Sequence, residues 1–291
     1  MPIDIITTYL TPMALALMMI GMGLSLTPDD FSRLFREPKS VMVGVLAQMI
    51  GLPMLGFLVA STFTLSASQS AGIMLLVSCA GGVVSGLLTQ MVRGDTALSV
   101  TMTAVSMLIG IFTIPIVVNA SLSHFLQQHQ YIELNLLDTS LRLLAMTVLP
   151  VMAGMLLRYS APVLSMRFKP SITRISNLLL VTIILLTMHQ YRDEIFHVST
   201  TLWLPLFSLN ALAMLLGFTC ARLAKLDDNI AKTMVIEVGI QNSATGIYIA
   251  SILLNNTLLA LPAIIYTGIA FINFFLFMLT LRTQYVYAKQ I

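Results

Sequence analysis

One carboxylate in this sequence, that of Glu237, lies well inside a hydrophobic stretch. It belongs to segment 236–243 (IEVGIQNS), which has apolar sequence on both sides. An ionised group in such surroundings costs several kcal/mol unless another group compensates its charge. A membrane helix with a carboxylate, a glycine and a Gln-Asn pair at mid-depth therefore indicates a site for a cation and a polar solute.

Neutral oxygen-bearing side chains lie in other hydrophobic stretches. Ser99, Thr103 and Ser106 recur at offsets of four and seven residues, which places them on one face of a helix, and Gln48 lies in a separate stretch. Each hydroxyl alone is more often bonded to a neighbouring helix or to its own backbone. Together with the carboxylate and Gln241, however, they supply neutral oxygens and one negative charge, a set that suits sodium. Calcium favours several carboxylates, and transition metals favour imidazoles or thiolates.

The composition predicts an all-α, polytopic membrane protein in which residues 1–291 form a single transmembrane domain. The chain is 57% hydrophobic and 9% charged, with a mean hydropathy of +0.92. A soluble domain carries about 25% charged residues. The start of the sequence shows neither a basic region nor a cleavage site, so we interpret it as mature sequence from Met1 onward. Cys79 and Cys220 lie in apolar surroundings and indicate neither a disulfide framework nor a metal site.

Nine stretches of the sequence are long and apolar enough to be membrane spans, each of which takes about 20 residues. They are predicted at 5–26, 40–63, 71–92, 95–119, 138–157, 173–190, 200–222, 230–253 and 258–281. Glu237 falls in the eighth stretch, Gln48 in the second, and Ser99 and Thr103 in the fourth. The helices that must position the site are therefore far apart in the chain.

The basic residues predict the orientation in the membrane. All of the 15 Lys and Arg except Arg142 and Arg192 fall at the same side, after the first, third, fifth, seventh and ninth stretches. Because Lys and Arg accumulate in cytoplasmic loops, the N-terminus is predicted outside and the C-terminus in the cytoplasm, in a multi-pass protein of the cell's inner (plasma) membrane. The same bias accounts for the net charge of +3 without a nucleic-acid partner.

Two of the predicted spans contain glycines near their midpoints. Gly81, Gly82 and Gly86 lie in the third stretch, and Gly239 lies next to the polar residues of the eighth. Each glycine weakens a helix by about 1 kcal/mol relative to alanine. Glycines also allow helices to pack closely, but two interrupted spans that run in opposite directions are typical of an inverted-repeat secondary transporter with its site at the bilayer midplane.

Three segments resemble conserved elements of the bile acid:sodium symporter family. They are 21–31 (GMGLSLTPDDF), 81–85 (GGVVS) with 94–103 (GDTALSVTMT), and 237–243 (EVGIQNS). The resemblance extends over essentially the whole membrane domain. It implies a core domain and a panel domain, with two discontinuous helices that cross in the core, and either ten spans or nine. The chain is similar to the nine-span form, as a bacterial-type member.

The resemblance also implies the residues that bind the transported species. One sodium site would use Ser85, Ser99, Thr103 and Glu237, and a second would use Gln48, Glu237, Gln241 and the carbonyls of Val238 and Ile240. The organic substrate would face Asn242, with Ser243, Val83 and Gly82 beside it.

The sequence departs from the family at the first of these sodium sites. Gly86 stands where the family usually has Asn, which removes a side-chain oxygen from the site. Ala80 replaces the usual Pro before the glycine pair, and Val83 occupies a commonly polar position. These departures favour one firmly held sodium ion over two.

The predicted function is sodium-coupled symport of an organic anion by alternating access, with either a bile-acid-like molecule or a small carboxylate such as pantoate as the substrate. One alternative is a proton-coupled or sodium-independent organic-anion transporter, in which the desolvated Glu237 could itself carry a proton. A remote alternative is an intramembrane enzyme that uses Ser85, but no His lies at mid-span to act as its base. Apart from the anion, sodium and the lipid bilayer, no obligate partner is evident.

Overall fold

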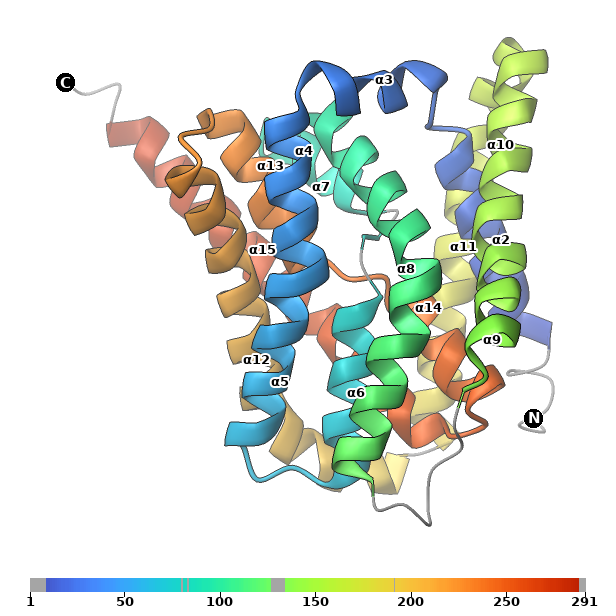
Figure 1. Cartoon of the computed structure of the whole chain (residues 1–291), viewed down its shortest axis with the longest axis vertical. Helices are drawn as coiled ribbons and strands as arrows, with labels where there is room; N and C mark the ends of the chain where they lie inside the picture. The colour runs from blue at the N-terminus through green and yellow to red at the C-terminus, as the bar shows by residue number, and fades with distance from the viewer. Residues whose placement is uncertain (1–8, 80, 83, 127–133, 191, 288–291) are drawn as a thin grey trace.

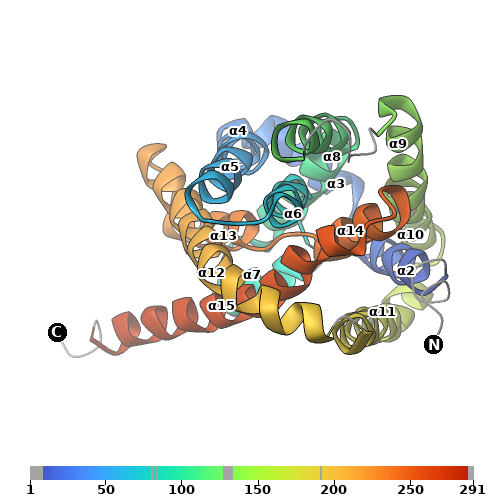
Figure 2. The same ribbon diagram turned by 90° about the horizontal axis from the view of Figure 1, so that it is seen from below.

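The protein is an all-helical bundle in the part of the chain that the computed structural model describes. These residues are 9–79, 81, 82, 84–126, 134–190 and 192–287. Most of the helices run along the long axis of the molecule (Figure 1), and Figure 2 shows them end-on. A helix satisfies its backbone hydrogen bonds internally, which is why apolar sequence of this kind crosses a membrane as helices.

The helices follow the apolar stretches closely. The α-helices are α2 Thr11–Gly23, α3 Pro28–Arg36, α4 Pro38–Leu46, α5 Leu52–Thr62, α6 Ala67–Ser78, α7 Ser85–Met91, α8 Thr96–Phe125, α9 Leu136–Leu143, α10 Leu149–Ser160, α11 Pro162–Gln190, α12 Arg192–Leu223, α13 Asp228–Gly239, α14 Ser243–Tyr248 and α15 Leu261–Tyr287. Short π-helical turns join α4 to α5 (Ala47–Gly51) and α9 to α10 (Leu144–Val148). A third such turn, Ile249–Leu253, extends α14, and a 3₁₀ turn, Thr257–Ala260, precedes α15.

Six continuous helices of the described residues are long and apolar enough to span a membrane, and α2 with α3 makes a seventh candidate that is bent by 68°. The six cover Pro38–Thr62, Thr96–Phe125, Leu136–Ser160, Pro162–Thr187, Thr201–Leu223 and Thr257–Leu281. The other two predicted spans are each divided into shorter helices. Length and composition therefore give six or seven spans, and the nine-span topology stays a prediction.

The sixth span begins earlier than the sequence predicts. We expected it to start at residue 173, but α11 already begins at Pro162. Proline is favoured in the first turn of a helix because its missing N–H is not needed there. Lys169, which we expected in the loop before this span, therefore lies inside a helix that qualifies as a membrane span by length and composition, and its place on the cytoplasmic side stays a prediction.

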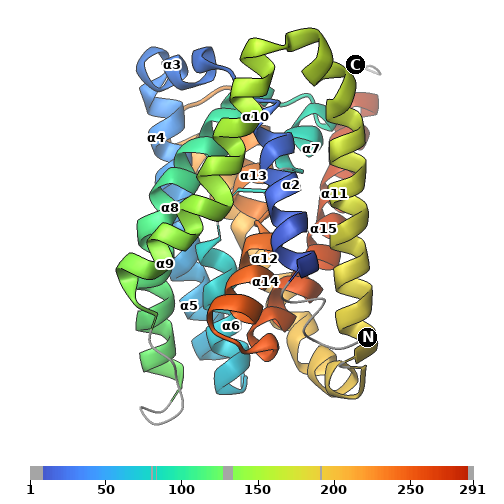
Figure 3. The same ribbon diagram turned by 90° about the vertical axis from the view of Figure 1, so that its right-hand side faces the viewer.

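The helices pack as two groups. In the first, α2 lies between α10 and α11 and contacts both (Figure 3). In the second, α6 packs against α5 and α8, while α12 packs against α5, α13 and α15. A continuous cluster of buried apolar side chains fills the bundle, with Leu15, Leu76 and Ile249 among its fully buried members.

Two of the predicted spans are interrupted at the same depth. One consists of α6, which ends at Ser78, and α7, which begins at Ser85, and the other consists of α13 and α14, separated by residues 240–242. In Figure 1 the first pair ascends from α6 to α7, whereas the second descends from α13 to α14. The backbone N–H of Asn242 donates to the carbonyl of Cys79 at 2.9 Å. The two interruptions therefore touch.

A polar corner fixes α3 against the start of α8. Asp95 caps α8 by accepting a hydrogen bond from the backbone N–H of Leu98 at 3.0 Å. Arg33 of α3 donates to both carboxylate oxygens of Asp95, at 2.8 Å to Oδ1. A bidentate guanidinium–carboxylate pair sets orientation as well as position. This corner therefore fixes α3, including its residue Asp30, at the end of the bundle.

Candidate functional site

The carboxylate of Glu237 is completely buried and accepts hydrogen bonds on both oxygens. Ser99 donates to Oε1, and Thr103 donates to Oε2 at 2.8 Å. The two hydroxyls come from adjacent turns of α8, as their four-residue spacing predicts. An ionised carboxylate that receives hydrogen bonds from hydroxyls is stabilised in its charged form.

Ser85, at the start of α7, lies on another side of the same carboxylate. Its hydroxyl also donates to the carbonyl of Gly82 at 2.7 Å. The hydroxyl has one proton and two acceptors within reach, Gly82 and Glu237. If a cation bound at the carboxylate, the Ser85 hydroxyl would keep donating its proton to the Gly82 carbonyl, and a lone pair of the Ser85 oxygen would be free to coordinate the ion.

Two buried glutamine side chains donate hydrogen bonds to the main chain near Glu237. Gln48 donates its amide N–H to the carbonyl of Glu237 at 3.0 Å and accepts from Ser106 at 2.9 Å. Gln241 donates to the carbonyl of Val238 at 2.8 Å, whereas its own side-chain oxygen is buried and has no hydrogen-bond partner among the described residues. A buried acceptor left unsatisfied costs about 1–3 kcal/mol, and a bound cation would remove that cost.

The predicted sodium ligands therefore fall into two sets. The structure brings Ser85, Ser99 and Thr103 to the carboxylate of Glu237. The side chains of Gln48 and Gln241 are hydrogen-bonded to carbonyls at the C-terminal end of α13, where Ile240 is the helix cap. All of these side chains offer oxygen atoms, the ligand type that a hard cation prefers.

The predicted substrate residues Gly82, Asn242 and Ser243 lie at the two touching interruptions, where a Cβ added to Gly82 would lie 3.3 Å from the carbonyl oxygen of Gln241. Gly82 also lines a pocket of about 490 Å³, which is described below. Asn242 caps α14 by accepting from the backbone N–H of Thr245 at 3.1 Å, and the hydroxyl of Ser243 accepts from Thr267 at 2.8 Å. Val83 lies outside the described residues.

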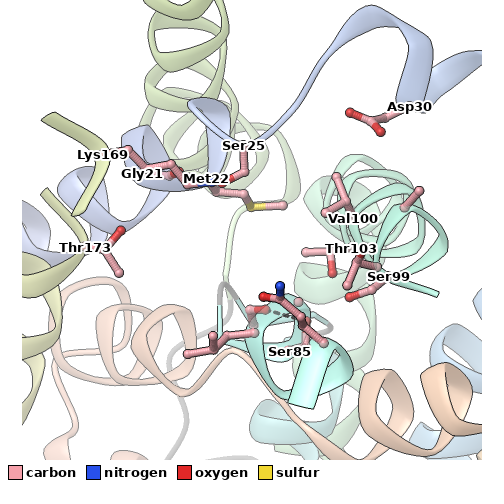
Figure 4. A pocket seen from close by; sticks show the side chains of 16 residues that line it. Gly21, Met22, Ser25, Asp30, Ser85, Ser99, Val100, Thr103, Lys169 and Thr173 are labelled. Carbon is pink, nitrogen blue, oxygen red and sulfur yellow. Dashed lines mark hydrogen bonds between the residues drawn. The ribbon is translucent and has the colours of Figure 1, made fainter. Parts of the chain in front are cut away.

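A pocket of about 490 Å³ lies beside the Glu237 cluster. Its two walls come from different helix groups: α2 and α11 on one side, and α7 with α8 on the other (Figure 4). Gly86 also lines it, and a Cβ added there would meet only the Ser99 hydroxyl within 4 Å, at 3.8 Å. The lining residues are Gly21, Met22, Ser25, Asp30, Gly82, Ser85, Gly86, Leu87, Gln90, Thr96, Ala97, Ser99, Val100, Thr103, Lys169 and Thr173.

A much smaller cavity lies on the far side of the two interruptions. It measures about 20 Å³ and is lined in part by Cys79, Asn242, Thr245 and Ser106. A volume of this size holds about one water molecule. Of these two cavities, the one on the α3 side of the interruptions is therefore much larger than the one on the other side.

Buried polar groups that we did not predict hold the C-terminal end of α13. The carbonyl of Gly239 accepts from Asn210 of α12 at 2.7 Å and from the hydroxyl of Tyr266 of α15 at 2.8 Å. Asn210 also donates to Tyr266 at 2.9 Å and accepts from Asn273 at 2.8 Å. The available sequence signal was an amide within an apolar run, at Asn210 and again at Asn273.

Replacing Tyr266 with Phe is expected to weaken sodium binding without abolishing it. The change removes one donor from the Gly239 carbonyl and leaves an amide proton of Asn210 without its acceptor, at a cost of about 1–3 kcal/mol. We expect the sodium concentration that gives half-maximal thermal stabilisation to rise about 3- to 10-fold. Tyr159→Phe, at a side chain that is 82% exposed, is the control. An unchanged sodium dependence in Tyr266→Phe would show that this network does not support the site.

Comparison with known proteins identifies related sequences along most of the chain. The profile of the Sodium Bile acid symporter family matches residues 12–198. An uncharacterized sodium-dependent transporter, YocS of Bacillus subtilis, is 29% identical over 246 residues, which cover 84% of this chain and 74% of that protein.

Two eukaryotic relatives have more specific names. The probable sodium/metabolite cotransporter BASS2 of rice chloroplasts is 32% identical over 257 residues, 88% of this chain and 60% of that protein. The human ileal sodium/bile acid cotransporter is 27% identical over 240 residues, 82% of this chain and 68% of that protein. The chain thus spans less than two thirds of the length of the rice protein.

Proposed function

Because the chain belongs to the sodium bile acid symporter family, we propose that it moves an organic anion across the membrane together with sodium. It is a multi-pass membrane protein of a transporter family and not an enzyme. The observation that carries the proposal is the buried Glu237 carboxylate with its hydroxyl donors, placed directly beside a pocket of about 490 Å³.

We propose that the fold is the nine-span, inverted-repeat form, with α6–α7 and α13–α14 as its two crossing discontinuous helices. The hydrogen bond between the interruptions and the opposite directions of the two pairs support this topology. In the proposal, α2, α10 and α11 form the panel domain, and the remaining long helices form the core. The α3 end faces the cytoplasm of a cell with this protein in its inner membrane, since most Lys and Arg lie there.

Sodium would bind at the carboxylate of Glu237. The surrounding hydroxyls of Ser85, Ser99 and Thr103 and the unpartnered oxygen of Gln241 supply neutral ligands. We propose one firmly held ion that both ligand sets share through Glu237, because Gly86 removes the side-chain oxygen that would let the set of Ser85, Ser99 and Thr103 hold an ion of its own. Hydroxyl donors on both carboxylate oxygens stabilise the ionised form, which is the form that binds sodium.

Coupling would follow from charge. Without sodium, the carboxylate of Glu237 and the carbonyls at the end of α13 repel an anion that enters the pocket. Sodium neutralises the carboxylate and crosslinks groups from both interruptions, including Ser85 and Gln241, and so orders the segment around Asn242. Alternating access then requires closure of the larger pocket and opening of the side that holds the smaller cavity, driven by the movement of one helix group against the other.

Uptake into proteoliposomes tests this function. We expect purified protein to accumulate a labelled organic anion, with pantoate and taurocholate as the two probes, in proportion to an imposed sodium gradient. Potassium in place of sodium, at fixed pH and zero membrane voltage, should reduce uptake to the level of empty liposomes. Uptake that proceeds equally in potassium would overturn the coupling, and uptake that follows an imposed pH gradient instead would favour the proton-coupled alternative.

A further inference from the structure

A lysine on the opposite wall of the pocket faces the Glu237 cluster. Lys169 and Thr173 of α11 line the pocket on one side, while Ser99 and Thr103 line it on the other (Figure 4). Lys169 and Thr173 are four residues apart and therefore share one face of the helix. The neighbouring basic residues of α11, Arg167 and Arg174, are exposed and do not line the pocket.

The position of Lys169 is costly for a cation. It lies about 10 Å along a helix that qualifies as a membrane span, and it is half-buried. Charged side chains within such spans face an interior or a wet cavity and usually have a functional role. Lys169 also lies close enough to Arg158 for their charges to repel.

Lys169 has no ion-pair partner among the described residues. The other charged groups around the pocket are already engaged. Asp30 accepts hydrogen bonds from the backbone N–H and the hydroxyl of Thr27, at 2.7 and 2.8 Å, and Arg158 donates to the carbonyls of Leu24 and Ser25. Asp30 keeps its negative charge but is held at the start of α3 by these bonds, so the ammonium of Lys169 is the charged group of the lining that is left to pair with an anionic ligand.

We propose that Lys169 binds the carboxylate of the transported solute, and that Thr173 assists as a hydroxyl donor. This inference rests on the proposed symport and names its substrate class as small monocarboxylates. With sodium bound, the charge of Glu237 is neutralised, and a monoanion can approach the positive charge of Lys169 without repulsion from that carboxylate. Because Lys169 belongs to one helix group and Glu237 to the other, an anion held between Lys169 and the bound sodium draws the two walls together. A neutral molecule of the same shape has no charge that would attract it to Lys169 or to the bound sodium.

The alternative is that the aliphatic part of Lys169 packs along the helix and its ammonium group extends to the membrane surface, as in lysines near helix ends. In that case its charge contributes nothing to substrate recognition. The two roles differ in one measurable respect, which is discrimination between an acid and its uncharged amide.

Transport of pantoate and competition by its primary amide separate these roles. Lys169→Gln is expected to raise the KM for pantoate by about tenfold or more, with little change in the sodium concentration for half-maximal uptake. Wild-type protein should prefer pantoate over the amide, and Lys169→Gln should lose most of that preference. Lys169→Arg should retain it. Arg167→Gln, which removes an exposed charge from the same helix, is the matched control and should resemble the wild type.

Sodium-induced thermal stabilisation in the absence of any organic anion shows whether each variant is folded with an intact cation site. If Lys169→Gln does not fold, Thr173→Val serves as the second variant, with an expected rise in the pantoate KM of about threefold. A folded Lys169→Gln protein that prefers pantoate over the amide as strongly as wild type overturns this inference and leaves the symport intact. Failure of wild-type protein to bind pantoate also overturns it, whereas sodium-independent uptake by wild-type protein overturns the proposed function itself.

Discussion

Glu237→Gln is expected to abolish sodium-driven uptake while leaving the protein folded. The amide has nearly the shape of the carboxylate. Its oxygen can still accept a hydrogen bond from one of the two hydroxyls, of Ser99 or Thr103, and its NH2 can donate to the oxygen of the other. What it loses is the negative charge. A unit charge about 4 Å from a cation contributes about 4 kcal/mol at an effective dielectric of about 20, so sodium affinity should fall by more than about 100-fold.

The measurement has two parts, uptake in a sodium gradient and thermal stabilisation by sodium. A ligand that binds only the folded state stabilises it by an amount that grows with its concentration relative to the dissociation constant, so the sodium-induced rise in Tm should vanish in Glu237→Gln. Glu37→Gln is the matched control, because Glu37 is exposed and pairs with Arg33 at the surface. A Glu237→Gln protein that still concentrates anion in response to sodium would show that the ion binds elsewhere.

Gly81→Ala is expected to destabilise the protein and to disrupt the sodium site together. Gly81 has a φ of +70°, a conformation that is costly for residues with a side chain, and an added Cβ would lie 3.0 Å from the methyl group of Thr103 and 3.2 Å from its Cα. Backbone strain and crowding together cost about 2–5 kcal/mol. Relief by movement of α8 would displace Thr103 from Glu237, so we expect a lower Tm and little sodium-dependent uptake.

The control for this variant is Gly268→Ala. Gly268 lies in α15, and a Cβ added there would meet nothing within 4 Å. Because alanine favours a helix by about 1 kcal/mol relative to glycine, this change should leave Tm equal or higher and leave uptake unchanged. If Gly81→Ala behaved in the same way, the close approach of the first interruption to α8 would have no role in the site.

Local patterns in the sequence were sufficient to predict the class of fold and the centre of the site. Hydropathy alone determines that the chain is a helical membrane protein, because about 20 apolar residues in a row have few other stable states. The cost of burying a carboxylate singles out Glu237, and the four-residue spacing of Ser99 and Thr103 places both hydroxyls on one face of α8. These inferences use composition and helical periodicity, which neighbouring residues determine.

Only the tertiary structure decides which distant groups meet. Glu237 and Ser99 are separated by 138 positions in the chain, and no local pattern states that their helices touch. The same holds for the Gly239 carbonyl, whose partners come from α12 and α15.

Lys169 shows the limit most clearly. Hydropathy placed it in a loop because charged residues lower the local average, whereas α11 starts earlier and packs against α2, which turns Lys169 towards the pocket. Packing between helices, and not the sequence around a residue, determines which cavity its side chain enters.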